Sequence, residues 1–288
     1  MSTVRGLVLG GGGVPGIAAH LGFLQGIAQA RISWDVMVGI SAGGIVAGSC
    51  GAEYDAKYDV RDTIGLLQVL EKRWRSILRF PWLLLPEVVP FAAWIKRSHD
   101  APGLLCLQWI LEKAIADHDI SPSVSSWKKG YGVIASDVTE GRPVLISCAN
   151  PAVRDTLSAL TATAAFPGLF SGVRAPDGHL LVDGGLYANL LYGAEAAAKL
   201  GATKVVAVQI GRETASMPQH ITLDDLFWTI ADQLTKLNSP NAASVPVLRV
   251  DIPTKGGLLS LDDWDEDMRI GHDAAEKHIA DIKSFWAE

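Results

Sequence analysis

A serine and two glycine-rich turns carry the chemistry in this sequence. Ser41 is the centre of Gly39-Ile-Ser-Ala-Gly43, a G-x-S-x-G motif that directly follows the apolar run Val36–Val38. Such a motif places a serine on a sharp strand-to-helix turn and lifts its hydroxyl above the sheet edge. The N-terminus of the following helix favours the negative charge that develops there. Ser41 is therefore the candidate nucleophile.

The other glycine turn comes first in the chain, where Gly6–Gly16 reads GLVLGGGGVPG. It follows a predicted strand and precedes a predicted helix, and Pro15 suits the first turn of that helix. The carboxyl ends of neighbouring parallel strands meet at one crevice, so this turn and Ser41 would face the same site. The turn would supply backbone N–H donors for an oxyanion.

A nucleotide is the alternative ligand for this turn, because Gly11–Gly16 matches G-x-G-x-x-G. A dinucleotide site also needs an acid that closes the second strand. Asp35 has about the required spacing, but it precedes the apolar residues of that strand. No Gly-Lys-Ser/Thr follows the turn, so a Walker A loop is excluded. The residues therefore favour an oxyanion site over a nucleotide site.

A nucleophilic serine needs a base, and histidine is the usual one. An α/β-hydrolase order of Ser41, Asp183 and then His272 or His278 is formally present. However, Ser41 follows only the second predicted strand, which is early for that fold. The two histidines also share one amphipathic C-terminal pattern and are expected to face solvent.

Asp183 remains as the candidate base. It follows the apolar run Leu180–Val182 and precedes Gly184 and Gly185, as expected for an acid at a strand end. A carboxylate with a pKa of about 4 is a weak base toward a hydroxyl. It can act when proton transfer is concerted with attack and preorganised donors stabilise the oxyanion. An ordinary Asp-Gly turn is the competing interpretation.

The elements that would position these residues alternate between strand and helix along the chain, which predicts an α/β sandwich with a mostly parallel sheet. The predicted strands are Val4–Leu9, Asp35–Val38, Gly132–Ser136, Val144–Ser147, Leu180–Val182, Lys204–Ile210 and Val245–Asp251. The predicted helices are Ile17–Ala30, Ala42–Gly51, Val60–Trp74, Leu104–Asp117, Tyr192–Leu200, Leu223–Leu237 and Asp263–Trp286.

Three ordered elements, GGGGVPG, GISAG and DGG, together resemble the patatin-like phospholipases, serine lipid acyl hydrolases with a Ser-Asp dyad. Thr161–Phe170 is similar to the small-residue helix and Pro-containing turn of that family. Gly132–Val144 is similar to its central strand, tight turn and next strand. The likeness runs from about Arg5 to about Ile210 and is loose beyond.

The resemblance implies a three-layer α/β/α sandwich, with Ser41 as nucleophile and Asp183 as base. The N–H groups of Gly11, Gly12 and Gly13 would form the oxyanion hole, and neither cofactor nor metal would be required. The remaining motif positions are Gly16, Gly39, Gly43, Gly184 and Gly185.

Pro15 departs from the family pattern, which often has Arg or Lys there. Proline removes a cation and an N–H, and it biases Val14 toward extended geometry. We therefore expect a neutral ester, a lysolipid or a short acyl substrate in preference to a doubly acylated anionic phospholipid.

The chain has 288 residues and a formal net charge of −6, which gives no support for a nucleic-acid partner. Three cysteines without the spacing of a disulfide framework and the lack of a signal-peptide pattern predict a cytoplasmic protein.

We expect one domain over residues 1–288, with 211–288 its loosely matched part. Residues 74–100 are a candidate insertion, and within them Trp74–Arg97 combines Trp, Pro and basic residues. That segment predicts either a loop or bent helical hairpin packed on the core, or a lid or peripheral membrane contact.

Two function classes follow from these observations. The first is a hydrolase of lipid or other acyl esters that works through an acyl-enzyme on Ser41. The second is a non-catalytic patatin-like module that binds or senses lipids, although the presence of both Ser41 and Asp183 favours the enzyme.

Overall fold

The computed structural model describes residues 3–52, 103–105, 107–108, 111–112, 120–212, 242–255, 257–258 and 260–287. The segment Trp74–Arg97 and the predicted helices Val60–Trp74 and Leu223–Leu237 lie outside these residues.

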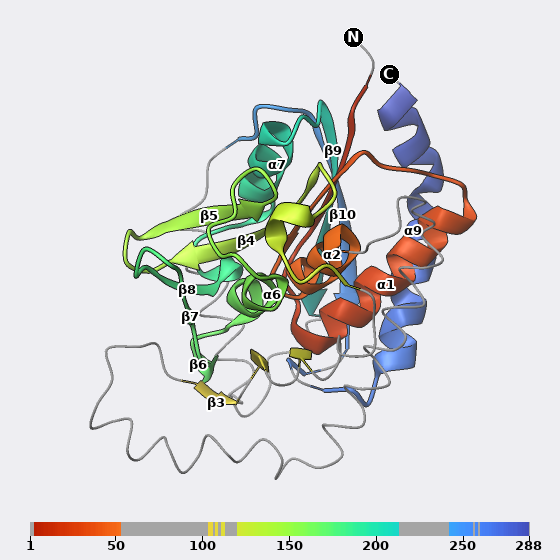
Figure 1. The fold of residues 1–288 in the computed structure, drawn as a ribbon. Helices are drawn as coiled ribbons and strands as arrows, with labels where there is room; N and C mark the ends of the chain where they lie inside the picture. Colours follow the sequence, from red (N-terminus) through yellow and green to blue (C-terminus); the bar gives the residue numbers. More distant parts are fainter. Residues whose placement is uncertain are drawn as a thin grey trace.

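An eight-stranded mixed sheet forms the middle of the molecule (Figure 1). Its parallel part has the order β10-β9-β1-β2-β4, with bounds β10 (Val247–Thr254), β9 (Lys204–Arg212), β1 (Arg5–Leu9), β2 (Val36–Ile40) and β4 (Tyr131–Asp137). Antiparallel pairing extends it through β5 (Arg142–Ser147), β8 (Leu180–Asp183) and β7 (Val173–Arg174). A separate two-stranded sheet joins β3 (Gly103–Leu105) and β6 (Gly168–Phe170).

Helices cover both faces of the sheet, which confirms the three-layer α/β/α sandwich (Figure 1). One face is covered by α1 (Gly13–Gln29), α2 (Ala42–Ala52), α6 (Thr156–Ala164) and α9 (Trp264–Ala287). The opposite face is covered by α7 (Leu190–Lys199). Strand side chains alternate between faces, so Leu7 and Leu9 pack against the first group of helices while Val8 packs on the side of α7.

The sequence patterns of the helices explain their ends and their buried faces. Asp155 caps α6 by accepting a hydrogen bond from the Ser158 N–H, and Asn189 caps α7 in the same way. In α9 the buried residues recur at helical spacing, so one stripe faces α1: Trp264, Asp267, Gly271, Ala275, Ile282 and Trp286. None of the helices within the described ranges is both long and apolar enough to span a bilayer.

Two strands meet end to end beside β4, and this arrangement creates the site. β5 occupies one edge of β4, so β2 and β8 share the other edge. β2 runs parallel to β4 and ends with Ile40 opposite Ile134, whereas β8 runs antiparallel and ends with Asp183 opposite Ala135. The carboxyl ends of β2 and β8 therefore point at each other.

Most predicted elements are confirmed to within a few residues, and two local expectations are wrong. Leu104 and Leu105 were expected to begin a helix, but they pair with β6 as part of β3. Val14 was expected to be extended, but it lies in the first turn of α1. The reason for the second difference is a tertiary contact of the Val14 N–H, described below.

Candidate active site

Ser41 lies at the turn between β2 and α2 with its backbone in the left-handed region, at φ 55°. Few non-glycine residues adopt such a conformation, and it concentrates at functional sites. The Ser41 N–H donates to Thr163 Oγ1 at 3.2 Å, and that hydroxyl donates in turn to the Ile134 carbonyl at 2.6 Å. Thr163 thereby holds the strained turn so that the serine hydroxyl projects from the end of β2.

Gly39 is required by the tightness of this turn. A β-carbon on Gly39 would lie 2.0 Å from the carbonyl oxygen of Gly43. No side chain fits there, because such an approach is far inside van der Waals contact. The motif glycines therefore serve to bring the first turn of α2 close against the end of β2.

Asp183 ends β8 and accepts a hydrogen bond of 2.7 Å from Ser41 Oγ at its Oδ2 atom. Its Oδ1 atom accepts the Gly185 N–H at 2.7 Å, and its own N–H donates to the Ala165 carbonyl. Two hydrogen bonds thus hold the side chain and a third holds the backbone, and the residue is only 3% exposed. The structure brings Ser41 and Asp183 together.

Burial raises the pKa of Asp183 to about 6, although the hydrogen bonds from Ser41 and Gly185 oppose the rise. A carboxylate out of water loses more solvation than the neutral acid does. Asp183 is therefore a stronger base than an exposed aspartate, and it is still ionised near neutral pH.

Ser136, in β4, braces the turn that follows Asp183. Its hydroxyl donates to the Gly184 carbonyl at 3.1 Å and accepts the Tyr187 N–H at 3.1 Å. This places a second buried hydroxyl behind the dyad and limits the motion of the Asp183 backbone.

The first glycine turn lies beside Ser41. The Gly43 N–H donates to the Gly10 carbonyl at 3.1 Å, which ties this turn to the start of α2. A β-carbon placed on Gly11 would be 3.9 Å from Ser41 Oγ. Among the described residues, the N–H groups of Gly11, Gly12 and Gly13 have no acceptor. They are therefore free to donate to a substrate oxygen.

A carbonyl from the C-terminal part of the chain closes over the start of α1. Leu258 O accepts the Val14 N–H at 2.8 Å. This bond holds Val14 in the helix despite the following Pro15. Gly13 has φ 61°, and a β-carbon on it would lie 2.3 Å from Leu258 O, so only glycine fits there.

The space above Ser41 is a pocket with mainly apolar walls. Ser41 and Asp183 open into it, and the apolar side chains come from α1, α2, the segment after α6 and the Leu258 loop. Among these side chains are Val14, Ile17, Ile45, Phe166, Phe170 and Leu258. Such walls suit an acyl chain better than a charged group.

The profile of the patatin-like phospholipase family matches residues 7–195, well over half of the chain. The chain belongs to this family. It is 26% identical over 213 residues to the neuropathy target esterase sws of Drosophila melanogaster, covering 72% of this chain and 13% of that protein. It is 28% identical over 239 residues to the lysophospholipase NTE1 of Coccidioides immitis, covering 82% of this chain and 13% of that one. This patatin-like chain thus spans about 13% of the length of these relatives.

Among solved structures, VipD from Legionella pneumophila superposes with a TM-score of 0.48 at 11% identity, covering 98% of this chain and 67% of that one. The type III effector protein ExoU superposes with a TM-score of 0.42 at 16% identity, covering 99% of this chain and 54% of that one.

The histidines of the formal triad lie elsewhere in this patatin-like fold. His272 contacts Gln29, which is the last residue of α1, and His278 pairs with Asp281 on its own helix. The glycine turn is at the other end of α1, about 24 Å away at 1.5 Å per residue. Neither histidine can serve Ser41 as a base.

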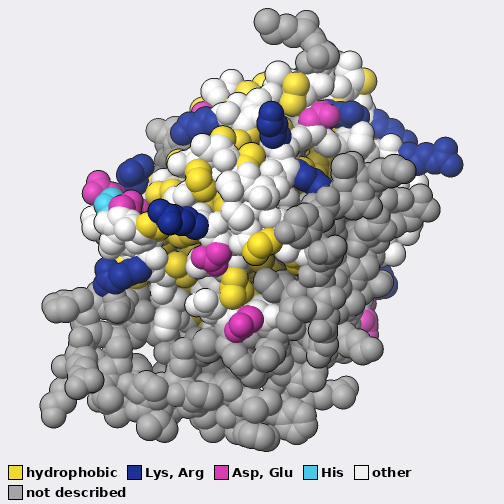
Figure 2. Space-filling model, viewed as in Figure 1, with side chains coloured by type: hydrophobic (Ala, Val, Ile, Leu, Met, Phe, Trp, Pro, Cys, Tyr) yellow, Lys and Arg dark blue, Asp and Glu magenta, His cyan; other side chains and the backbone are white. Residues whose placement is uncertain are grey.

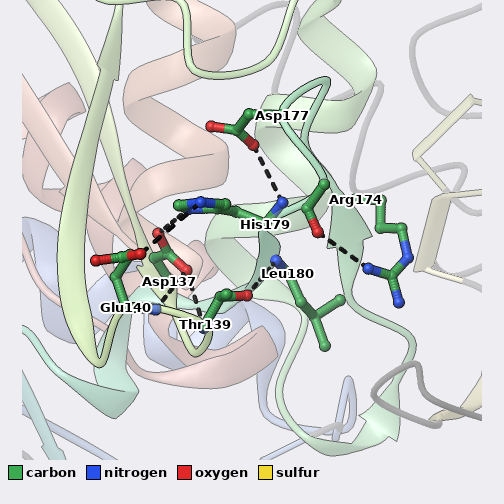
Figure 3. Close-up of polar contacts among 8 residues, drawn as sticks. Asp137, Thr139, Glu140, Arg174, Asp177, His179 and Leu180 are labelled. Carbon is green, nitrogen blue, oxygen red and sulfur yellow. Dashed lines mark hydrogen bonds and ion pairs between the residues drawn. The ribbon is translucent and has the colours of Figure 1, made fainter.

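A second buried aspartate, Asp137, has a histidine partner (Figure 3). Asp137 ends β4, and its Oδ2 atom lies 2.7 Å from His179 Nδ1. The N–H groups of Thr139 and Glu140 donate to its other oxygen. His179 precedes β8, about 13 Å along the strand from Asp183. This pair clamps the β4–β8 junction and does not reach Ser41.

One side-chain group in the described part of the chain has the spacing of a metal site, namely His272, Asp273 and Glu276 on α9. Two of the three are exposed, and Asp273 pairs with Arg269. The group lies near the far end of α1 and has no link to the dyad.

Three supporting residues were not found by the sequence analysis: Thr163, Ser136 and Leu258. Thr163 and Ser136 lie within stretches that the family resemblance covers, so the resemblance could have drawn attention to them. Leu258 acts through its backbone carbonyl, which has no signature in sequence.

Proposed function

We propose that this protein hydrolyses carboxylic esters of lipids through an acyl-enzyme on Ser41. The observation that carries the proposal is the 2.7 Å hydrogen bond from Ser41 Oγ to the buried Asp183 carboxylate, made beside glycine N–H groups that have no acceptor among the described residues. Membership of the patatin-like phospholipase family supports a lipid hydrolase. The names of the relatives, an esterase and a lysophospholipase, support the same class.

In the first half-reaction Asp183 takes the Ser41 proton while Oγ attacks the ester carbonyl carbon. The N–H groups of the Gly11–Gly13 turn and the N-terminus of α2 would stabilise the oxyanion. Collapse breaks the bond to the alcohol, which leaves with the proton from Asp183. In the second half-reaction Asp183 takes a proton from water, the water oxygen attacks the acyl carbon, and the carboxylic acid leaves as Ser41 regains its proton.

The substrate we propose is a neutral or zwitterionic ester, such as a lysolipid or a short acyl ester, rather than a doubly acylated anionic phospholipid. The pocket walls are apolar, and Pro15 stands where the family often has a cation. On the face of the molecule that Figure 2 shows, the Lys and Arg side chains of the described residues are spread out and form no single basic patch. Faster hydrolysis of anionic than of zwitterionic phospholipid vesicles would overturn this preference.

A cytoplasmic location and a membrane contact through Trp74–Arg97 stay predictions. A non-catalytic lipid-binding module remains the second candidate, because Ser41 and Asp183 could be present without turnover.

The deciding experiment combines turnover of p-nitrophenyl butyrate with intact-mass measurement after a fluorophosphonate. We expect the wild type to turn over and gain one adduct, and Ser41→Ala to lose the adduct and at least about 10⁴-fold in kcat. Ser49→Ala is the matched control, since Ser49 is a buried hydroxyl on α2 without a partner among the described residues. It should behave as the wild type. A wild type with neither turnover nor adduct would favour the lipid-binding module.

A further inference from the structure

A buried histidine contacts the peptide between Gly10 and Gly11. His20 lies on α1 with no exposed surface, and its Nε2 atom is 2.8 Å from the Gly10 carbonyl oxygen. Because a carbonyl only accepts, Nε2 carries the proton and donates it. The same oxygen also accepts the Gly43 N–H.

The other ring nitrogen of His20, Nδ1, is buried without a partner among the described residues. A buried polar atom without a hydrogen bond is destabilising, and an apolar side chain of similar size would avoid that cost. Burial lowers the pKa of His20 to about 4, opposed by the bond to Gly10, so the ring is neutral at ordinary pH. The polar contact that the structure records for this side chain is therefore the one to Gly10.

Because the peptide between Gly10 and Gly11 is trans, this contact also determines the direction of the Gly11 N–H. In a planar trans peptide the C=O and the following N–H point in opposite directions. With the Gly10 carbonyl directed at His20 and Gly43, the Gly11 N–H must point away from them. A β-carbon on Gly11 would lie 3.4 Å from Ser41 Cβ, so Gly11 borders the nucleophile.

The two residues of this peptide do not themselves fix its plane. Both flanking residues are glycine, so side-chain sterics set no preference for one orientation over its reverse. Rotation of the plane would turn the Gly10 carbonyl toward the site and withdraw the Gly11 N–H from it. The two hydrogen bonds to Gly10 O are what oppose that rotation.

We propose that His20 is a positioning residue, which locks the Gly10–Gly11 peptide with its N–H available to the oxyanion. The inference rests on the proposed ester hydrolysis at Ser41. In this role, a residue outside the pocket preorganises one donor of the glycine turn, and preorganisation is what makes such donors effective.

The test compares His20→Phe, which keeps a ring of similar size without a donor, with His20→Gln, which keeps a donor. We expect His20→Phe to lower kcat for p-nitrophenyl butyrate by about 10- to 100-fold with little change in KM, because loss of one full oxyanion donor costs about 10²–10³-fold. His20→Gln should restore most of the activity. Phe23→Leu is the matched control, since it disturbs the buried side of the same helix without touching Gly10.

A second readout separates positioning from a merely structural role. Sulfur accepts hydrogen bonds more weakly than oxygen, so an intact donor set discriminates against the thiono analogue of the ester. The ratio of kcat/KM for the ester to that for the thionoester should fall in His20→Phe and stay at the wild-type value in Phe23→Leu. If His20→Phe does not fold, His20→Leu and His20→Met take its place with the same expectation.

An unchanged kcat and an unchanged ester-to-thionoester ratio in the donorless variants, with an active wild type, would overturn the role of His20 alone. An equal loss in Phe23→Leu and His20→Phe would overturn it too, because the effect would then be general destabilisation. A wild type without turnover or fluorophosphonate adduct would instead contradict the proposed function, and the inference would fall with it.

Discussion

Two buried aspartates end two strands that pair with each other, yet their surroundings give them opposite properties. Asp183 ends β8 and meets a serine, whereas Asp137 ends β4 and meets His179. Burial raises the pKa of Asp183 to about 6, and its neutral partner cannot offset that rise. Burial also acts to raise the pKa of Asp137, but the hydrogen bonds from His179, Glu140 and Thr139 outweigh it and lower the pKa.

The difference shows that the familiar Asp-His pair is not by itself a sign of catalysis. In the described part of the chain, the pair in Figure 3 makes no hydrogen bond with a serine or cysteine side chain, and it joins two strand ends. The Asp-Ser pair faces an apolar pocket and lies beside a glycine turn whose N–H groups have no acceptor among the described residues. Asp137, which stabilises the fold, has a charge that hydrogen bonds stabilise. Asp183, the candidate base, has a charge that burial destabilises.

The largest expected effect separates the two aspartates by activity. Asp183→Asn removes the base and should lower kcat by about 10²–10⁴-fold, the usual range for general-base catalysis. Asp137→Asn should leave kcat for p-nitrophenyl butyrate within about twofold, since Asp137 lies opposite Leu181, two residues along β8 from Asp183, and its carboxylate is bound by His179 and not by Ser41. Equal losses in both variants would show that the distinction between the two regions is wrong.

The next largest expected effect is that of Asp183→Asn on stability, which should rise although activity falls. A carboxyl whose folded pKa is raised from 3.8 to about 6 destabilises the folded protein above pH 6, and the penalty vanishes as pH falls through 3.8. Asp183→Asn should therefore raise the unfolding free energy at pH 8 by up to about 3 kcal/mol. Thermal unfolding at pH 8 and pH 4 measures this, and a gain of equal size at both values would refute the cause given.

The smallest expected effect concerns the pair of Asp137 and His179. Because the pKa of His179 is raised by its bond to Asp137, the contribution of His179 to the free energy of unfolding is complete below pH 6.5 and is lost as pH rises through the folded pKa. The contribution of Asp137 to the same free energy is complete above pH 3.8 and is lost in more acidic solution. His179→Gln should thus lower the melting temperature most between pH 4 and 6.5 and least at pH 9. A loss that does not vary with pH would mean that only packing is involved.

Much of this site could be predicted from the sequence, since its central residues lie in short motifs. G-x-S-x-G and the glycine turn predict strand ends and tight turns from local sterics alone, and both are confirmed. Asp183 was less certain from its residues, because an Asp-Gly pair also marks ordinary turns. The order of the three motifs and the family resemblance identified it.

The rest depends on contacts between distant parts of the chain. β2 and β8 meet end to end because β8 pairs antiparallel with β4. The sequence analysis expected only parallel strands whose carboxyl ends share one crevice, so it did not predict this meeting. Val14 is helical because Leu258, far along the chain, accepts its N–H. His20 contacts a backbone carbonyl, and a backbone acceptor leaves no pattern in a sequence.

The central claim is that a buried carboxylate, and not a histidine, activates Ser41. The most direct measurement is the pH dependence of kcat/KM for p-nitrophenyl butyrate at two temperatures, with p-nitrophenol followed at its isosbestic wavelength. Since kcat/KM reports the free enzyme, we predict an acid limb with its midpoint near the pKa of Asp183, about 6. The midpoint should hardly move with temperature, as is typical of carboxyl groups. A midpoint that falls strongly on warming, as for an imidazole, or activity that stays constant down to pH 4, would contradict the account.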